Sequence, residues 1–289
     1  MALILRAMSS VMINICLMLY VMDFIPRHQM VRSEPLRLFS GCLPWGLGPW
    51  IGVELYKNFG PGGTAVMSFV SYTALLALFA YLRISDNPAV APARRPLPNP
   101  FSSIARFVAQ PRLRLAWFIA FGRSAWWAMF FVYPTLYLRN NDVDDTWSGA
   151  LTGAGNILLI LTLPIGWLAR RIGIRKPIVT AFLAAGALTL IVPFTWHHVA
   201  VTGLLFLAGA LFVVTLDALG TIPFMRSVRS YERPQMTALF GTYVYFSDLL
   251  PGLAYLVLQG YFDLRSVFLF CGLLTLAAGL VATRLPRSM

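Results

Sequence analysis

The sequence predicts an all-α, polytopic membrane protein of about nine transmembrane helices. Of its 289 residues, 58% are hydrophobic and only 12% are charged, whereas soluble domains carry about 25% charged residues. Long apolar runs follow one another along the chain, and each is close to the roughly 20 residues that cross a bilayer about 30 Å thick. These runs are too long and too uniformly apolar for the alternating strands of an outer-membrane barrel.

Nine apolar runs are expected to cross the membrane as helices. They are residues 3–25, 38–56, 64–82, 115–138, 148–169, 178–196, 199–224, 236–258 and 265–283. Only His197 and His198 separate the sixth and seventh runs. Pro193 favours a break at this point, because proline removes a helical hydrogen bond.

The longest polar connection divides the chain into three parts. Residues 1–82 are expected to form a partial N-terminal bundle of three helices, and residues 115–289 a C-terminal bundle of six. Residues 83–114 between them form an Arg-rich linker, in which the prolines of residues 88–100 exclude a helix. Residues 101–107 are expected to form a short interfacial helix.

The basic residues predict the orientation. Eighteen of the 23 Lys and Arg lie in alternate connections, and the side that carries them is expected to be cytoplasmic. The N-terminus is then outside and the C-terminus cytoplasmic, in a multi-pass protein of the cell inner membrane. This asymmetry accounts for the net charge of +12 without a nucleic-acid partner.

Residues 41–52 carry small residues and prolines in a pattern typical of close helix contact. Gly48 and Gly52 permit helix backbones to touch, and Pro49 leaves a carbonyl group unpaired. The segment resembles the Gly-x-x-x-Gly-Pro-x-x-Gly antiporter motif in the fifth helix of the major facilitator superfamily, with Pro44 in place of the first glycine. A Gly-rich packing face without an antiporter role is the alternative interpretation.

Two further segments resemble motifs of the same superfamily. Residues 166–176 resemble its loop motif, Gly-x-x-x-Asp-Arg-x-Gly-Arg-Lys. The matching residues are Gly166, Arg170 (where the family has Asp), Arg171, Gly173, Arg175 and Lys176. Arg6 and Ser10 resemble the Arg-x-x-x-Gly pattern of the fourth helix. A purely topological anchor remains an alternative for the loop segment, as does an interfacial arginine for Arg6.

The resemblance covers essentially the whole chain and implies a partial major facilitator fold that lacks the first three helices, through truncation, a misassigned start or remodelling. It implies a transporter of a small solute that works by alternating access, is coupled to protons or another ion, and favours export. The alternative is a non-transporting remnant or an assembly subunit of the same fold. Homo-oligomerisation is left open.

Three ionisable residues lie deep in predicted spans, where a charge costs at least about 2.5 kcal/mol. Arg123, about 13 Å beyond Arg114 at 1.5 Å per residue, shares its face with Trp127. Asp217 lies at a similar depth, and Asp248 shares a face with Tyr245. Two interpretations are open for these residues: a substrate and coupling-ion site, or a permanent ion pair between Arg123 and one of the two aspartates.

The sequence carries no nucleotide-binding loop, zinc-binding His-Glu pattern or paired haem ligands. We therefore expect neither an enzyme nor a bound cofactor or metal. Cys16, Cys42 and Cys271 lie inside apolar runs and show no metal or disulfide spacing. The expected partners are the lipid bilayer, an unidentified small solute and a coupling ion.

Overall fold

A computed structural model describes residues 2–81, 100–143 and 145–286. All regular secondary structure in these residues is helical, which confirms the predicted all-α class. Most of the predicted linker, residues 83–99, lies outside the described residues. Its last part includes a helix, α3 (Pro100–Ala109), where a short interfacial helix is predicted.

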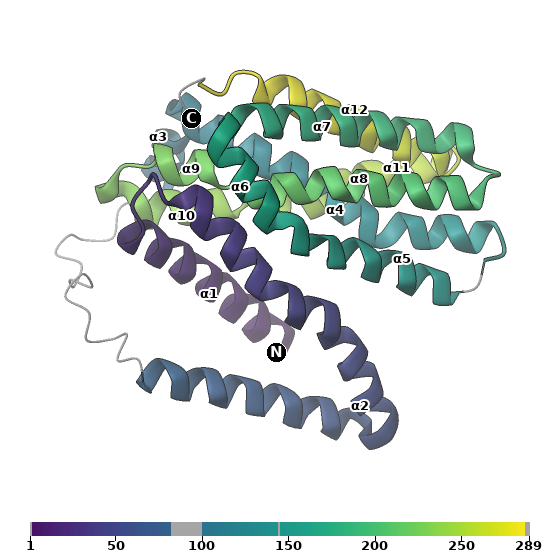
Figure 1. Cartoon of the computed structure of the whole chain (residues 1–289), viewed down its shortest axis with the longest axis horizontal. Helices are drawn as coiled ribbons and strands as arrows, with labels where there is room; N and C mark the ends of the chain where they lie inside the picture. Colours follow the sequence, from purple (N-terminus) through teal and green to yellow (C-terminus); the bar gives the residue numbers. More distant parts are fainter. Residues whose placement is uncertain (1, 82–99, 144, 287–289) are drawn as a thin grey trace. The chain divides into compact units, whose positions relative to one another are not determined.

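The helices follow one another with short connections. Besides α3, they are α1 (Ala2–Phe24), α2 (Met30–Tyr81), α4 (Pro111–Asn140), α5 (Asp145–Ile157), η2 (Leu158–Leu161), α6 (Thr162–Ile172), α7 (Arg175–Ile191), η3 (Val192–Thr195), α8 (Val199–Leu219), α9 (Ile222–Ser227), η4 (Ser230–Glu232), α10 (Arg233–Gly241), α11 (Tyr243–Tyr261) and α12 (Arg265–Ala282) (Figure 1).

Two compact units make up the chain. One unit joins Met1–Ser40 to Pro100–Met289, and the other is Gly41–Asn99. The first unit therefore groups α1 and the first turns of α2 with the C-terminal helices. The division at residues 82 and 115 predicted from the sequence stays a prediction.

Among the described residues, six segments are long and apolar enough to cross a membrane, by length and composition. They are Asn58–Leu78, Pro111–Asn140, Trp147–Ile172, Arg175–Thr195, Val199–Ser227 and Arg265–Ala282. Val11–Phe24 is a shorter apolar helix. The other predicted spans, 38–56 and 236–258, are also helical, in α2 and in α10 with α11, and nine crossings stay a prediction.

Regular α-helical hydrogen bonding is interrupted inside two of the predicted spans. The span predicted over 199–224 lies within the apolar segment Val199–Ser227, in which α8 ends at Leu219 and α9 begins at Ile222. Pro223 has no N–H to donate to the carbonyl of Leu219, four residues earlier. Pro164 likewise cannot donate to Ile160, which lies in the 3₁₀ turn η2 between α5 and α6.

The start of the second predicted span is wrong, since α2 already begins at Met30. Arg32 and Arg37 therefore lie on a helix and not in a loop. The second and third predicted spans are the two arms of α2, which bends at Gly60 with φ 64° and ψ −159°. This left-handed φ favours glycine, the residue without a Cβ.

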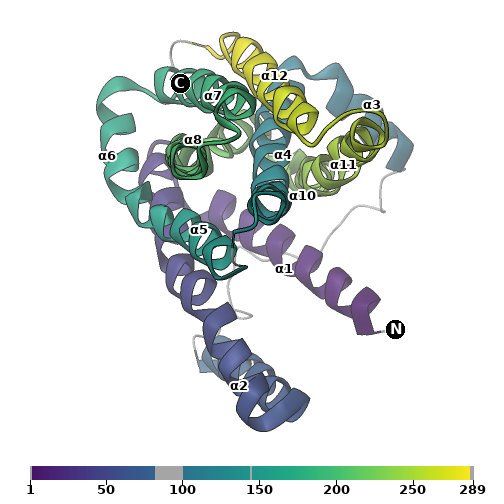
Figure 2. The same ribbon diagram turned by 90° about the vertical axis from the view of Figure 1, so that its right-hand side faces the viewer.

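The core of the first unit surrounds α4. This helix contacts α8, α11 and α12, and α7 contacts both α8 and α12. Figure 2 looks along these helices and shows α4 among them. Trp126 on α4 is buried and donates a hydrogen bond from Nε1 to Thr189 Oγ1 on α7, at 2.9 Å. A buried tryptophan needs such a partner for its N–H, so this contact fixes the rotation of α4.

The first turns of α2 pack closely on α6 within this unit. A Cβ added at Gly166 would lie 2.5 Å from Pro35 Cγ and 3.2 Å from the Val31 carbonyl oxygen. Thr162, one turn earlier, donates from Oγ1 to the Pro35 carbonyl at 3.2 Å. The glycine is thus required by helix packing, which adds a structural role to a residue of the loop motif.

Gly166→Leu is expected to lower the free energy of unfolding by about 1–3 kcal/mol relative to a matched leucine substitution, because the new side chain overpacks this contact. Gly149→Leu on α5 is the control, since a Cβ there meets no atom within 4 Å. Both changes gain the same helix propensity, so their difference isolates packing. Equal thermal stability of the two purified variants would contradict the α2–α6 contact.

Candidate functional site

A buried ion pair joins two of the residues singled out by their depth in the sequence. Arg123 on α4 donates from Nη1 to Asp217 Oδ1 on α8 at 2.8 Å. The side chains are 14% and 9% exposed, respectively. Trp127, one turn after Arg123, donates from Nε1 to Asp217 Oδ2 at 2.8 Å. Both carboxylate oxygens are therefore engaged by α4.

Tyr243 extends this cluster to a third helix. Arg123 donates from Nη2 to Tyr243 Oη at 2.9 Å, and its guanidinium carbon lies 5.5 Å from the centre of the Tyr243 ring. The Arg123 Nε is buried without a hydrogen-bond partner in the structure. One guanidinium group thus connects α4, α8 and α11, and its Nε has no acceptor within the described residues.

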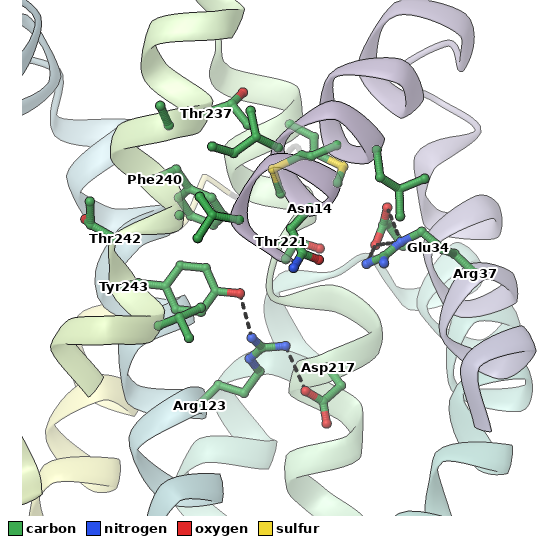
Figure 3. Close-up of a pocket in the computed structure, with 18 of the residues that line it drawn as sticks. Asn14, Glu34, Arg37, Arg123, Asp217, Thr221, Thr237, Phe240, Thr242 and Tyr243 are labelled. Carbon is green, nitrogen blue, oxygen red and sulfur yellow. Dashed lines mark hydrogen bonds and ion pairs between the residues drawn. The ribbon is translucent and has the colours of Figure 1, made fainter. Parts of the chain in front are cut away.

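This cluster forms one wall of a cavity of about 640 Å³. Figure 3 shows Arg123, Asp217 and Tyr243 on one side, with Asn14, Glu34 and Arg37 on the other. The remaining lining residues come from α1, the start of α2, and the stretch from α8 to α11. They are Val11, Ile15, Leu17, Met18, Leu38, Thr221, Met225, Thr237, Ala238, Phe240, Gly241, Thr242, Val244 and Tyr245.

A second ion pair faces the same cavity from the start of α2. Arg37 Nη2 lies 2.9 Å from Glu34 Oε2, and the Glu34 side chain is fully buried. Residues three apart lie on one face of a helix, so the pairing is built into the sequence. Each of the four charged residues that line this cavity in the described part of the chain is paired within it.

Two short interruptions of the α-helical hydrogen-bond pattern lie at the cavity, although the backbone keeps right-handed helical dihedrals at both. Thr221 follows the end of α8, and Thr242 stands between α10 and α11. Thr242 Oγ1 receives a hydrogen bond from Trp117 Nε1 at 3.1 Å and donates to the Leu239 carbonyl at 2.6 Å. The oxygens Thr221 Oγ1 and Thr237 Oγ1, by contrast, are buried without a hydrogen-bond partner in the structure.

The structure separates the remaining candidates from the ion pair. Asp248 is exposed and lines a second hollow of about 360 Å³ with Tyr133, Gly252 and Tyr255. Tyr245 is 53% exposed and reaches the first cavity, near Tyr243. Of the two aspartates considered as partners of Arg123, Asp217 is the one that contacts it.

The antiporter-like motif lies on the first arm of α2, in the second unit. The side-chain surroundings of Gly48 and Pro49 lie outside the described residues. A Cβ at Gly52 would meet no described atom within 4 Å. The role of these three residues in helix packing stays a prediction.

The loop motif connects α6 to α7. Gly173 ends α6 with a φ of 81°, a conformation that favours glycine. Arg171 lies 4.0 Å from the centre of the Trp167 ring, and Arg175 Nη2 donates to the Thr283 carbonyl after α12. Arg170, Arg171, Arg175 and Lys176 all lie on the side predicted to be cytoplasmic, at the end of α6 and the start of α7.

The turn between α1 and α2 is held against the C-terminal helices of the same unit. Asp23 forms an ion pair with Arg233 at the start of α10, at 2.5 Å. Arg27 Nη2 donates to the Val228 carbonyl at 3.0 Å, and Arg226 Nε donates to the Arg27 carbonyl at 3.2 Å. These contacts lie on the Arg-rich side of the protein, and we call them the Arg27 turn contacts.

Sequence reasoning missed Tyr243, Glu34, Thr221 and Thr237. The spacing of Glu34 and Arg37 is a signal that could have revealed that pair. Tyr243 has no such signal, because its partner Arg123 lies 120 positions away in the sequence.

No family model and no curated protein matches the sequence. Among solved structures, the chain is similar to the crystal structure of a bacterial homologue of the iron transporter ferroportin, in an outward-facing state. The TM-score is 0.75 at 14% identity, over 96% of this chain and 68% of that one. The chain has the fold of a membrane transporter. This likeness in fold agrees with the predicted multi-pass membrane protein.

Proposed function

We propose that the protein carries a small solute across the cell inner membrane by alternating access, as a member of the major facilitator superfamily. One observation carries the proposal: the cavity is lined by a buried charge cluster that three helices share, within a fold similar to that of a transporter. Ionisable side chains inside a membrane-spanning helical bundle commonly mark a substrate or ion pathway. The cavity volume of about 640 Å³ also falls in the range of about 300–1,000 Å³ that small-molecule sites occupy.

Asp217 is the proposed proton or ion site. When it is ionised, its two oxygens hold Arg123 and Trp127. Uptake of a proton by the carboxylate would weaken both contacts and release the guanidinium group toward the cavity and Tyr243. Protonation would in this way be coupled to a change in how α4, α8 and α11 contact one another. Export is the proposed direction, on the resemblance of residues 41–52 to the antiporter motif.

The Arg27 turn contacts are the proposed cytoplasmic gate. For the cavity to open on the Arg-rich side, the Asp23–Arg233 ion pair and the hydrogen bond from Arg27 to Val228 must break. An ion pair at a water-exposed rim contributes little to stability, about 0–1 kcal/mol. Such a contact can therefore open and close at little energetic cost.

Thiol labelling tests alternating access without knowledge of the solute. In a variant without Cys16, Cys42 and Cys271, a cysteine at Ala238, an exposed residue of the cavity, is expected to react with a membrane-impermeant reagent added from either side. The double change Asp23→Asn and Arg233→Gln is expected to raise the labelling rate from the cytoplasmic side several-fold. Ala210→Cys on α8, which is fully buried, is the unreactive control.

Labelling of the Ala238→Cys variant from one side alone, with or without the gate substitutions, would contradict alternating access. It would favour a non-transporting subunit of the same fold. Sealed vesicles of both orientations supply the two sides in this experiment.

A further inference from the structure

The fixed charges of the cavity cancel. Arg123 is compensated by Asp217 and Arg37 by Glu34, at N–O distances of 2.8 and 2.9 Å. These four are the charged residues among the described lining of the cavity. A ligand with a net charge would leave water without meeting an uncompensated opposite charge, and desolvation of an ion is costly in such surroundings. A ligand without net charge avoids that cost.

The wall contributed by α1 is mainly apolar. Val11, Ile15, Leu17 and Met18 line it, and Leu38 of α2 continues it. Buried apolar area is the main source of affinity for small ligands, at about 25 cal/mol per Å². This wall therefore suits an apolar body such as an aromatic ring or a short aliphatic group.

The opposite wall offers hydrogen-bonding groups that have no partner within the protein. Thr237 is 1% exposed and Thr221 is 6% exposed, and the hydroxyl oxygen of each is buried without a partner. The Nε of Arg123 is in the same state. Unpaired buried polar groups are uncommon because each costs about 1–3 kcal/mol. Three such groups belong to residues that line one cavity, and this favours a ligand that supplies the missing partners.

We infer that this cavity binds a small amphipathic organic solute of zero net charge, either uncharged or zwitterionic. Its apolar body lies against α1 and Leu38, and its polar group lies among Arg123, Tyr243, Thr221 and Thr237. A zwitterion would place its anionic group toward Arg123 and its cationic group toward Asp217 or Glu34. This inference names a substrate class for the proposed transporter and rests on that proposal.

Four probes with the same phenyl body test the charge preference: 3-phenylpropanamide (uncharged), phenylalanine (zwitterionic), 3-phenylpropanoate (anionic) and 2-phenylethylamine (cationic). Their dissociation constants for the purified full chain in lipid nanodiscs are obtained from the shift of the thermal unfolding midpoint with probe concentration. The two probes of zero net charge are expected to bind at least about tenfold more tightly than the two charged ones. Fe²⁺ alone is measured in parallel and is expected to cause no shift.

Matched variants identify the cavity as the binding site. Thr237→Val is expected to weaken binding of 3-phenylpropanamide about three- to tenfold, the effect of one hydrogen bond. Thr275→Val on α12 is the control, because that hydroxyl is equally buried and donates to the Cys271 carbonyl within its own helix. It is expected to leave every dissociation constant unchanged.

Removal of one carboxylate from the cavity is expected to reverse the preference for probes of zero net charge over the anionic probe. Asp217→Asn leaves Arg123 uncompensated, and 3-phenylpropanoate is then expected to gain about tenfold relative to the amide. Glu34→Gln makes the same test at Arg37 if the first variant does not fold. Tighter binding of a singly charged probe or of Fe²⁺ to the unmodified chain, or no binding of any probe, would overturn the inference. Thiol labelling from both sides would meanwhile leave the transporter proposal standing.

Discussion

Arg123→Gln is expected to lower the free energy of unfolding by about 3 kcal/mol and to abolish transport. The substitution removes the partner of Asp217 and leaves a carboxylate that is 9% exposed with one remaining donor, from Trp127. Breaking a buried ion pair on one side costs about 3–5 kcal/mol, because the other charge remains buried without compensation. Reversible unfolding in mixed micelles measures the loss, and solute flux in proteoliposomes measures the activity.

A double-mutant cycle separates the role of the pair in stability from its role in transport. Arg123→Gln with Asp217→Asn is expected to recover most of the lost stability, because no buried charge is then left unpaired. The same change with Asp248→Asn is expected to recover none, since Asp248 lies exposed in a separate hollow. Transport should remain absent in both double variants. Normal transport by Arg123→Gln would contradict a substrate or coupling role for this residue.

Arg123→Lys provides a finer test of the same cluster. The guanidinium group contacts Asp217 and Tyr243 through two different nitrogens, and an ammonium group is a single point of charge without this planar geometry. We expect the lysine variant to retain most of the stability and to lose most of the transport. Full activity would indicate that charge compensation alone is required at this position.

Ala238→Trp is expected to abolish transport without a comparable loss of stability. Ala238 is exposed on α10 and lines the 640 Å³ cavity, so an indole ring at this position would occupy the space proposed for the solute. A transported solute is first identified by comparing efflux from cells with and without the protein. The flux of this solute should fall to background in the Ala238→Trp variant. The stabilisation of the purified protein by 3-phenylpropanamide should disappear in parallel.

Ala200→Trp is the matched control for this prediction. Ala200 is exposed at the start of α8 and does not line the cavity, and tryptophan is well tolerated near a membrane interface. The solute flux of the Ala200→Trp variant should equal that of the unmodified protein. Undiminished flux in Ala238→Trp would show that the solute does not pass through this cavity.

Hydropathy and the positions of polar and proline residues were sufficient to predict the helical class and most of the helices. Apolar runs of the length of a bilayer predicted most of the helices, because in lipid the backbone must satisfy its own hydrogen bonds. The interruptions of the helices were harder to predict from the sequence. Pro164 and Pro223 lie next to two of the places where the spans are interrupted. Proline is also tolerated inside membrane helices, so its effect depends on the neighbouring helices.

The sequence by itself determined that Arg123 and Asp217 are candidates, because the depth of a charge within a span depends only on its position along the chain. It could not determine which aspartate meets Arg123, nor that Tyr243 contacts Arg123. Those contacts depend on the rotation of α4, α8 and α11 about their axes, which is set by packing between residues about 90 to 120 positions apart. Only the tertiary structure decided the pairing, because helical periodicity specifies a face but not the neighbour that the face meets.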